Sequence, residues 1–191
     1  AKTILVYAEQ GIGDEIMFAS CVPDLLKLAD TCVLECAPRL ESLFRRSFPG
    51  AIVHGSAQSD ADTGWLSSAG HIDCQIAAGS LLGHFRRKWP DFPLHDGYLR
   101  ADPARTANWR ERLAGLGTGL RIGIAWRGGA VSTRRELRST RLEQWQPLLQ
   151  QENCCFVSLQ YGDGKAEAAA LTAERGHAVH CWQEAIDDLD E

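Results

Sequence analysis

Short apolar runs and longer amphipathic stretches alternate along the chain. The first run, residues 3–8, is rich in β-branched and aromatic side chains and has the length of a strand. The next stretch, residues 15–29, places Ile16, Ala19 and Leu26 at helical spacing. The same pattern predicts further strands at residues 32–36, 51–54, 72–76, 120–126, 155–159 and 178–181, and helices at 38–48, 79–85, 101–116, 142–151 and 165–175. This alternation is typical of an α/β fold with parallel sheets and right-handed crossovers.

The alternation restarts once, after the helix predicted at residues 101–116. Trp109, Leu113 and Leu116 mark the expected buried stripe of this helix, and a second series of strands and helices opens at Leu120. The second series is short, and so small a parallel sheet would leave faces and edges uncovered. We therefore expect two Rossmann-like lobes with parallel sheets: an N-terminal lobe over residues 1–100, a linker helix over 101–119, and the first part of a C-terminal lobe over 120–191. The second lobe is expected to be incomplete and the chain to be a fragment.

Composition limits which partners and which cellular location can be expected for the chain. The 191 residues carry a formal net charge of −5, which argues against general affinity for nucleic acid. No run of about 18 apolar residues is present, so no membrane span is expected. The seven cysteines have irregular spacing without a zinc pattern. No signal peptide is recognised, so we expect a cytoplasmic protein. We also expect it to use no metal or other cofactor.

The turn between the first predicted strand and helix reads Gly11-Ile12-Gly13-Asp14. Its two glycines permit positive φ angles or the close approach of a ligand, and the helix start suits a phosphate, a carboxylate or a developing negative charge. The carboxylate of Asp14 would repel a phosphate, so Asp14 either caps the helix or has a chemical role. Position 16 is Ile rather than the third glycine of a dinucleotide fingerprint, and no P-loop Lys-Ser/Thr follows.

Four arginines are concentrated in one polar loop, residues 127–139, after the predicted strand 120–126. They are Arg127, Arg134, Arg135 and Arg138, and they are accompanied by Gly128, Gly129, Ser132, Thr133 and Ser139. Guanidinium groups and backbone N–H groups together suit a diphosphate, and the alternative is a solvated basic loop. Open α/β sheets bind ligands at the carboxyl ends of their strands, where residues 10–14, 127–139 and 160–165 are expected.

Several motifs come in an order that resembles a known family. They are Gly11-Ile12-Gly13-Asp14-Glu15-Ile16-Met17-Phe18-Ala19-Ser20, Tyr98-Leu99-Arg100-Ala101-Asp102-Pro103, Ile122-Gly123-Ile124-Ala125-Trp126-Arg127-Gly128, Arg138-Ser139, and Phe156-Val157-Ser158-Leu159-Gln160-Tyr161-Gly162. Over essentially the whole chain, they resemble the glycosyltransferase-like domain that follows tetratricopeptide repeats in many bacterial proteins. That domain is similar to the ADP-heptose:lipopolysaccharide heptosyltransferases, which have the two-Rossmann GT-B fold.

The resemblance implies a nucleotide-sugar transferase with the acceptor, a glycan or a protein, on the first lobe and the nucleotide on the second. The implied role of Asp14 is that of general base on the acceptor hydroxyl. Arg138 matches the position that contacts the diphosphate, and Arg127 and Ser139 would steady the same leaving group. Gly11, Gly13 and Gln160 complete the predicted substrate-binding set, and no metal is expected.

Two departures from the family pattern concern the ends of the chain. The acidic segment 187–191 would be followed in the family by a helix, a strand and an Asp-x-x-x-x-His nucleotide loop, and a repeat array would precede Ala1. We therefore expect the chain alone to be inactive. The alternative to a transferase fragment is a non-catalytic module that binds carbohydrate or a protein on the same fold. A redox Rossmann enzyme is disfavoured by Ile16.

Overall fold

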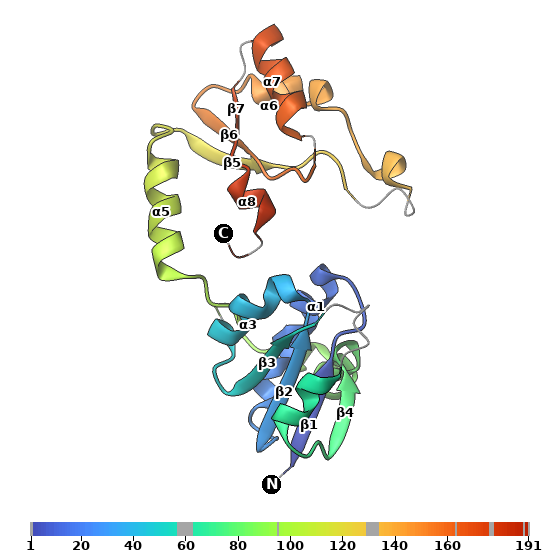
Figure 1. Cartoon of the computed structure of the whole chain (residues 1–191). Helices are drawn as coiled ribbons and strands as arrows, with labels where there is room; N and C mark the ends of the chain where they lie inside the picture. Colours follow the sequence, from blue (N-terminus) through green and yellow to red (C-terminus); the bar gives the residue numbers. More distant parts are fainter. Residues whose placement is uncertain are drawn as a thin grey trace. The chain divides into compact units, whose positions relative to one another are not determined.

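The computed structural model describes residues 2–56, 63–94, 96–128, 134–162, 164–175, 178–188 and 190. Two compact units make up the chain, the first over Ala1–Asp102 and the second over Pro103–Leu189. Each is an α/β unit with its own parallel sheet (Figure 1), which confirms the predicted fold class. The helix that was predicted as a linker belongs to the second unit.

The sheet of the first unit has the strand order β3-β2-β1-β4, and all four strands are parallel. The strands are β1 (Thr3–Tyr7), β2 (Thr31–Cys36), β3 (Ala51–Gly55) and β4 (Cys74–Ala77). Consecutive residues of the central strands are buried, as Leu5 and Val6 are in β1 and Val33 and Leu34 are in β2. Burial on both faces explains why these strands are continuous apolar runs without alternation.

Short helices connect the strands of this sheet and follow the last of them. They are α1 (Ile12–Phe18), η1 (Ala19–Cys21), α2 (Val22–Leu25), η2 (Pro38–Leu40), α3 (Glu41–Ser47), η3 (Gly64–Ala69), η4 (Ala78–Ser80), α4 (Leu81–Phe85) and η5 (Trp89–Asp91). The single helix expected at residues 15–29 is therefore wrong, because α1 passes into a 3₁₀ turn at Ala19. Pro23 lies at the start of α2, where its missing N–H costs little, whereas it would break a continuous helix.

The sheet of the second unit has three parallel strands in the order β5-β6-β7. They are β5 (Leu120–Ile124), β6 (Cys154–Ser158) and β7 (Val179–Cys181). The helices are α5 (Pro103–Ala114), η7 (Arg135–Arg138), η8 (Leu142–Trp145), α6 (Gln146–Leu149), α7 (Gly164–Arg175) and α8 (Glu184–Asp187). The predicted helix 142–151 thus begins as a 3₁₀ turn, and α8 was not expected.

One core cluster holds the second unit together. Its buried members are Ile124, Trp126, Leu142, Leu149, Phe156, Ala168, Leu171 and Val179. The predicted buried stripe of α5 is wrong in degree, because the helix contains no fully buried residue. Trp109 of α5 instead packs its ring against Trp182, with centroids 5.2 Å apart, and remains half-buried.

Candidate functional site

The turn after β1 lies where the strand order of the first sheet reverses. β2 and β3 are added on one side of β1, and β4 pairs with its other side. In open α/β sheets such a reversal marks the edge where ligands bind, beyond the carboxyl ends of the strands. The chain leaves β1 at Tyr7 and enters α1 at Ile12. The topology therefore puts Gly11, Gly13 and Asp14 at the edge that the sequence predicted.

Asp14 does not cap the helix. α1 begins at Ile12 with Gly11 as its N-cap residue, and among the described residues no side-chain hydrogen bond caps it. Of the two uses that the glycines permit, Gly11 does not take the positive φ, because its φ of −74° and ψ of 162° are extended backbone. A Cβ on Gly11 would lie 3.6 Å from Asp14 Oδ2, whereas a Cβ on Gly13 would meet no heavy atom within 4 Å. Asp14 lies in the first turn of α1 and is half-buried. The space beside Gly13 is open.

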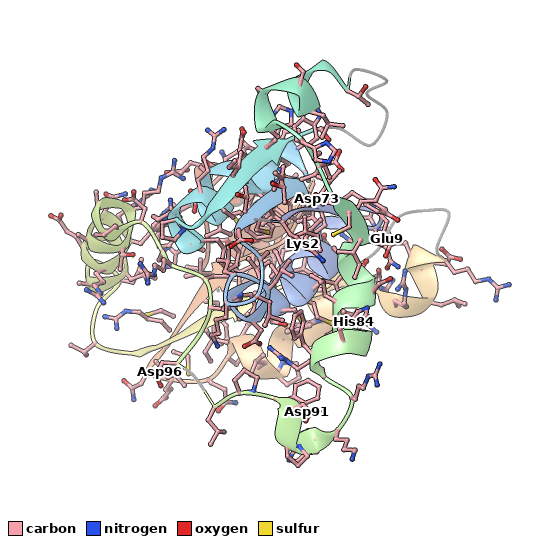
Figure 2. The ribbon with its side chains drawn as sticks, turned by 90° about the horizontal axis from the view of Figure 1, so that it is seen from below. Lys2, Glu9, Asp73, His84, Asp91 and Asp96 are labelled. Carbon is pink, nitrogen blue, oxygen red and sulfur yellow. The ribbon has the colours of Figure 1, made fainter. Side chains whose placement is uncertain are left out.

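Glu9 is a second carboxylate at this edge, and the sequence reasoning missed it. A Cβ on Gly79, just after β4, would lie 2.9 Å from Glu9 Oε1 and 3.1 Å from a ring carbon of Phe18. Glycine at position 79 therefore gives the Glu9 side chain its room. Figure 2 shows the exposed Glu9 beside the segment that also carries His84. Its position directly after a predicted strand was the available signal.

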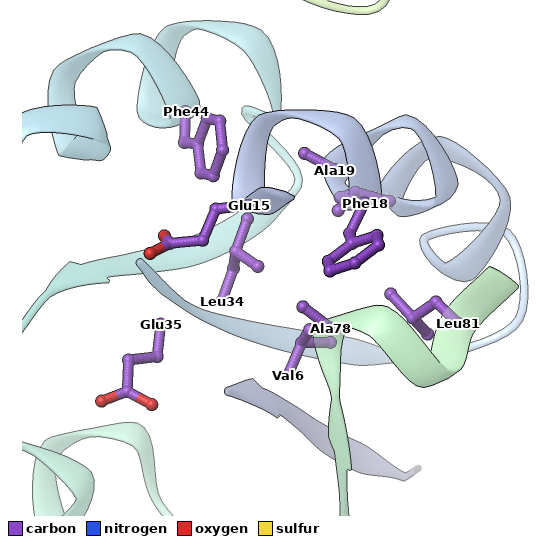
Figure 3. Close-up of a pocket in the computed structure, with 10 residues that line it drawn as sticks. Val6, Glu15, Phe18, Ala19, Leu34, Glu35, Phe44, Ala78 and Leu81 are labelled. Atoms are coloured by element: carbon purple, nitrogen blue, oxygen red, sulfur yellow. The ribbon is translucent and has the colours of Figure 1, made fainter. Parts of the chain in front are cut away.

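Glu15, next to Asp14, is buried and links α1 to the segment that follows β2. It is 6% exposed, and its Oε2 accepts a hydrogen bond of 2.8 Å from the backbone N–H of Ala37, just after β2. Burial raises the pKa of Glu15; the Ala37 N–H lowers it and the nearby Glu35 raises it. Figure 3 shows Glu15 on α1 and Glu35 on β2, with both carboxylates directed away from the aromatic ring of Phe18. Glu15 therefore fastens α1 to the segment that follows β2.

We expect Glu15→Gln to stabilise the chain above the ordinary carboxyl pKa. Because the pKa is raised, the folded chain binds more protons here than the unfolded chain, so ionisation costs stability as the pH rises. Glutamine stays neutral, and its side-chain oxygen can accept the same Ala37 bond. Melting temperatures from about pH 4 to about pH 8 should show a rising advantage of the variant, whereas the exposed control Glu174→Gln should show none. A lower melting temperature for Glu15→Gln at about pH 8 would mean that the charged hydrogen bond outweighs burial.

In the second unit, a pocket of about 500 Å³ opens at the carboxyl ends of β5 and β6. Its polar lining includes Arg127, Arg135 and Gln160. The structure thus brings two of the predicted residues, Arg127 and Gln160, to one pocket. Arg138 and Ser139 belong to the same loop but are not among the described lining residues. Arg135, which the sequence placed in the arginine loop but not in the predicted substrate-binding set, lines the pocket instead.

Gln160 joins the two loops at this edge. It is 4% exposed, and its Oε1 accepts the backbone N–H groups of Trp126 at 3.0 Å and Arg127 at 2.8 Å. Its Nε2 donates to the carbonyl oxygens of Arg127 at 3.3 Å and Tyr161 at 2.9 Å. A Cβ on Gly164 would lie 2.7 Å from Gln160 Cγ, so α7 begins tightly against this side chain. The amide thus fastens the loops together, and its direct contact with a substrate stays a prediction.

Arg127 has one paired and one unpaired edge. Its Nη1 forms an ion pair of 3.0 Å with Glu167 Oε2. Its Nε and Nη2 are buried, and within the described part of the chain they have no hydrogen-bond partner. Buried donors without a partner are rare and costly, and each requires an explanation. An anion in the adjoining pocket would provide one.

The rest of the arginine loop is described only in part. Residues 129–133, which include Gly129, Ser132 and Thr133, lie outside the described residues. The hydroxyl of Ser139 donates to the carbonyl oxygen of Arg135 at 2.6 Å and accepts the N–H of Gly128 at 3.4 Å. Arg138 is exposed on η7. Arg134 has a φ of 54°, a left-handed conformation that is uncommon for a residue with a side chain.

The described residues show neither a metal-binding cluster nor a membrane-spanning helix. No group of three or more His, Cys, Asp or Glu side chains is placed to hold a metal ion in the described part of the chain. Among the same residues, no helix has both the length and the apolar character needed to cross a bilayer.

The class that fold and site define is an α/β protein with two parallel sheets and an arginine-lined pocket at a strand edge. No protein-family model matches the chain, and no solved structure matches it. The chain is similar to Protein FlbA of Caulobacter vibrioides (strain ATCC 19089 / CIP 103742 / CB 15), with 34% identity over 203 residues. The match covers 100% of this chain and 34% of FlbA, so the chain spans about a third of the length of that relative.

Proposed function

We propose that the chain is part of a nucleotide-sugar-dependent glycosyltransferase of the heptosyltransferase-like kind. The observation that carries the proposal is Arg127, which lines the pocket at the carboxyl ends of β5 and β6 and has two buried donors, Nε and Nη2, without a hydrogen-bond partner among the described residues. A buried cationic edge of this kind matches the oxygens of a phosphate group. The donor is then a nucleotide sugar and the acceptor a hydroxyl of a glycan or a protein.

The reaction is a direct displacement at the anomeric carbon of the donor sugar. The acceptor oxygen forms a bond to this carbon while the bond between the carbon and the diphosphate oxygen breaks. Asp14 takes the hydroxyl proton as general base. It suits this role because it lies at the carboxyl edge of the first sheet and is not used as a helix cap.

On the donor side, the diphosphate leaves with its bonding electron pair. Arg127 offers two N–H donors to the developing charge, and Arg138 and Ser139 contribute from the same loop in this proposal. Donors already fixed in place stabilise a leaving group more than mobile ones, because they need no reorganisation. No metal ion is needed in this scheme.

The chain is placed in the cytoplasm in this proposal, with tetratricopeptide repeats as a possible part of the longer protein. All seven cysteines are free thiols, which fits the reducing cytoplasm. Tetratricopeptide repeats in a longer protein would present the acceptor to the transferase domain. FlbA is longer than this chain, and its name states no activity.

The direct test is titration calorimetry with ADP and with inorganic pyrophosphate. Arg127→Ala and Arg138→Ala are each expected to lower the affinity for ADP by about 1.5–3 kcal/mol, the range for a hydrogen bond to a charged group. Arg110→Ala, an exposed arginine of α5, is the matched control and should leave the affinity unchanged. Absence of ADP and pyrophosphate binding both to the unmodified chain and to a longer protein that contains it would favour the non-catalytic binding module.

A further inference from the structure

Glu167 lies behind the proposed anion site and connects three elements of the second unit. It is in the first turn of α7. Its Oε2 accepts the indole N–H of Trp126 at 2.8 Å and forms the 3.0 Å ion pair with Arg127 Nη1. Its Oε1 accepts the backbone N–H of Leu142 at 3.3 Å. Glu167 thus ties the segment after β5, the start of η8 and the start of α7 to one carboxylate.

This arrangement determines which edge of the Arg127 guanidinium is left for a ligand. The group is planar, and Nε and Nη2 lie side by side on one edge, whereas Nη1 is held by Glu167. The two unpaired nitrogens are therefore the neighbouring pair that can donate two parallel hydrogen bonds to one oxyanion. With Glu167 on the opposite side, the guanidinium cannot turn this edge away without losing its ion pair.

We propose that Glu167 is a positioning residue, which holds Arg127 so that its Nε/Nη2 edge receives one phosphate group of the donor diphosphate. This inference rests on the proposed function and adds a residue that has no predicted contact with the substrate. Glu167 acts through Arg127, because its own oxygens are already occupied by Trp126, Arg127 and Leu142.

Electrostatics alone predicts the opposite effect of removing this carboxylate. A negative charge beside a bound diphosphate repels it, so a neutral side chain at position 167 would strengthen binding if charge were all that mattered. If Glu167 positions Arg127, Glu167→Gln weakens binding instead, because a glutamine amide no longer forms an ion pair with the guanidinium. The sign of the change therefore separates the two roles.

A double-mutant cycle with inorganic pyrophosphate as the probe tests the inference. Glu167→Gln, Arg127→Ala and the double variant are titrated beside the unmodified chain, and thermal melts confirm folding. We expect Glu167→Gln to lower pyrophosphate affinity about fivefold or more, and to change it by less than about twofold in the Arg127→Ala background, since contacting residues couple. Trp126→Phe removes the indole bond to Glu167 together with part of a buried core side chain, keeps the Arg127 ion pair, and should leave that coupling in place.

A ligand-free measurement reports the positioning directly. The Arg127 Nε–H is buried, so its exchange with solvent, followed by nitrogen-15 NMR, should be slow in the unmodified chain and in Trp126→Phe, and fast in Glu167→Gln. Unchanged slow exchange in Glu167→Gln, or pyrophosphate binding that is unchanged or stronger, would overturn the role of Glu167 alone. Absence of pyrophosphate and ADP binding both to the unmodified chain and to a longer protein that contains it would overturn the proposed function together with this inference.

Discussion

In a preparation that transfers sugar from a nucleotide donor, Asp14→Asn is expected to lower kcat by roughly 10²–10⁴-fold, the range for losing a general base. Asparagine preserves the shape of the side chain but cannot accept the proton. The free energy of unfolding should change by no more than about 1 kcal/mol, the size of a helix-dipole contribution, because Asp14 makes no capping bond among the described residues. Initial rates at saturating donor and acceptor, with a thermal melt of the same samples, measure both quantities.

Glu9→Gln is the matched control for Asp14→Asn. Glu9 is an exposed carboxylate that follows the same strand, so its loss changes the charge of this edge by the same amount. If general charge at the edge controlled turnover, the two variants would lose similar activity. An equal loss in both, or a fall in stability without a fall in kcat for Asp14→Asn, would contradict the assignment of the base.

The strands were predictable because of how they are buried. The central strands β1 and β2 are covered on both faces, so their sequences are continuous apolar runs that stand out from their surroundings. The edge strand β4 has a weaker pattern, with Cys74 and Gln75 exposed, and it begins two residues after the predicted Ile72. The parallel order follows from the alternation of strands with helices, whereas the placement of β4 beside β1 is a tertiary choice that periodicity does not encode.

The helices were less predictable, because apolar spacing persists through turns that are not α-helical. Residues 15–29 keep one buried side across α1, η1 and α2, so the pattern alone gives one long helix. Pro23 was the local signal for the break, because proline removes a donor that a continuous helix needs. In α5, Trp109 and Leu113 have the correct spacing, but they remain half-buried.

Two features of the site were predictable from the sequence: its position at the ends of strands and the types of residue in it. Topology placed Asp14 and Arg127 at the carboxyl edges of their sheets, where the sequence predicted them. The hydrogen bonds of the neighbouring residues were missed because their partners are distant in sequence: Glu15 bonds Ala37 across 22 positions, and Glu167 bonds Trp126 across 41. An acidic residue in the first turn of a helix is common for reasons of the helix dipole, so it gave no specific signal.

Phe44→Ala is expected to cost about 3–5 kcal/mol in unfolding free energy, the range for removing a buried aromatic ring. Phe44 is 1% exposed and packs edge to face on Phe48, with ring centroids 5.5 Å apart. Ile52 of β3 is 48% exposed, so Ile52→Ala is the matched control and should cost less than about 1 kcal/mol. Denaturant unfolding of both variants decides whether this ring carries the stability that its burial indicates.

Leu142→Ala is the counterpart of Phe44→Ala in the second unit, and comparison of the two tests whether the cores are separate. Leu142 is fully buried in the cluster with Ile124 and Phe156, so its loss should cost about 2–5 kcal/mol. Because each unit has a core of its own, Phe44→Ala should speed amide hydrogen exchange in β1 and β2 and leave β5 and β6 unchanged, and Leu142→Ala should do the reverse. Faster exchange in both sheets for either variant would show that the chain unfolds as one cooperative unit.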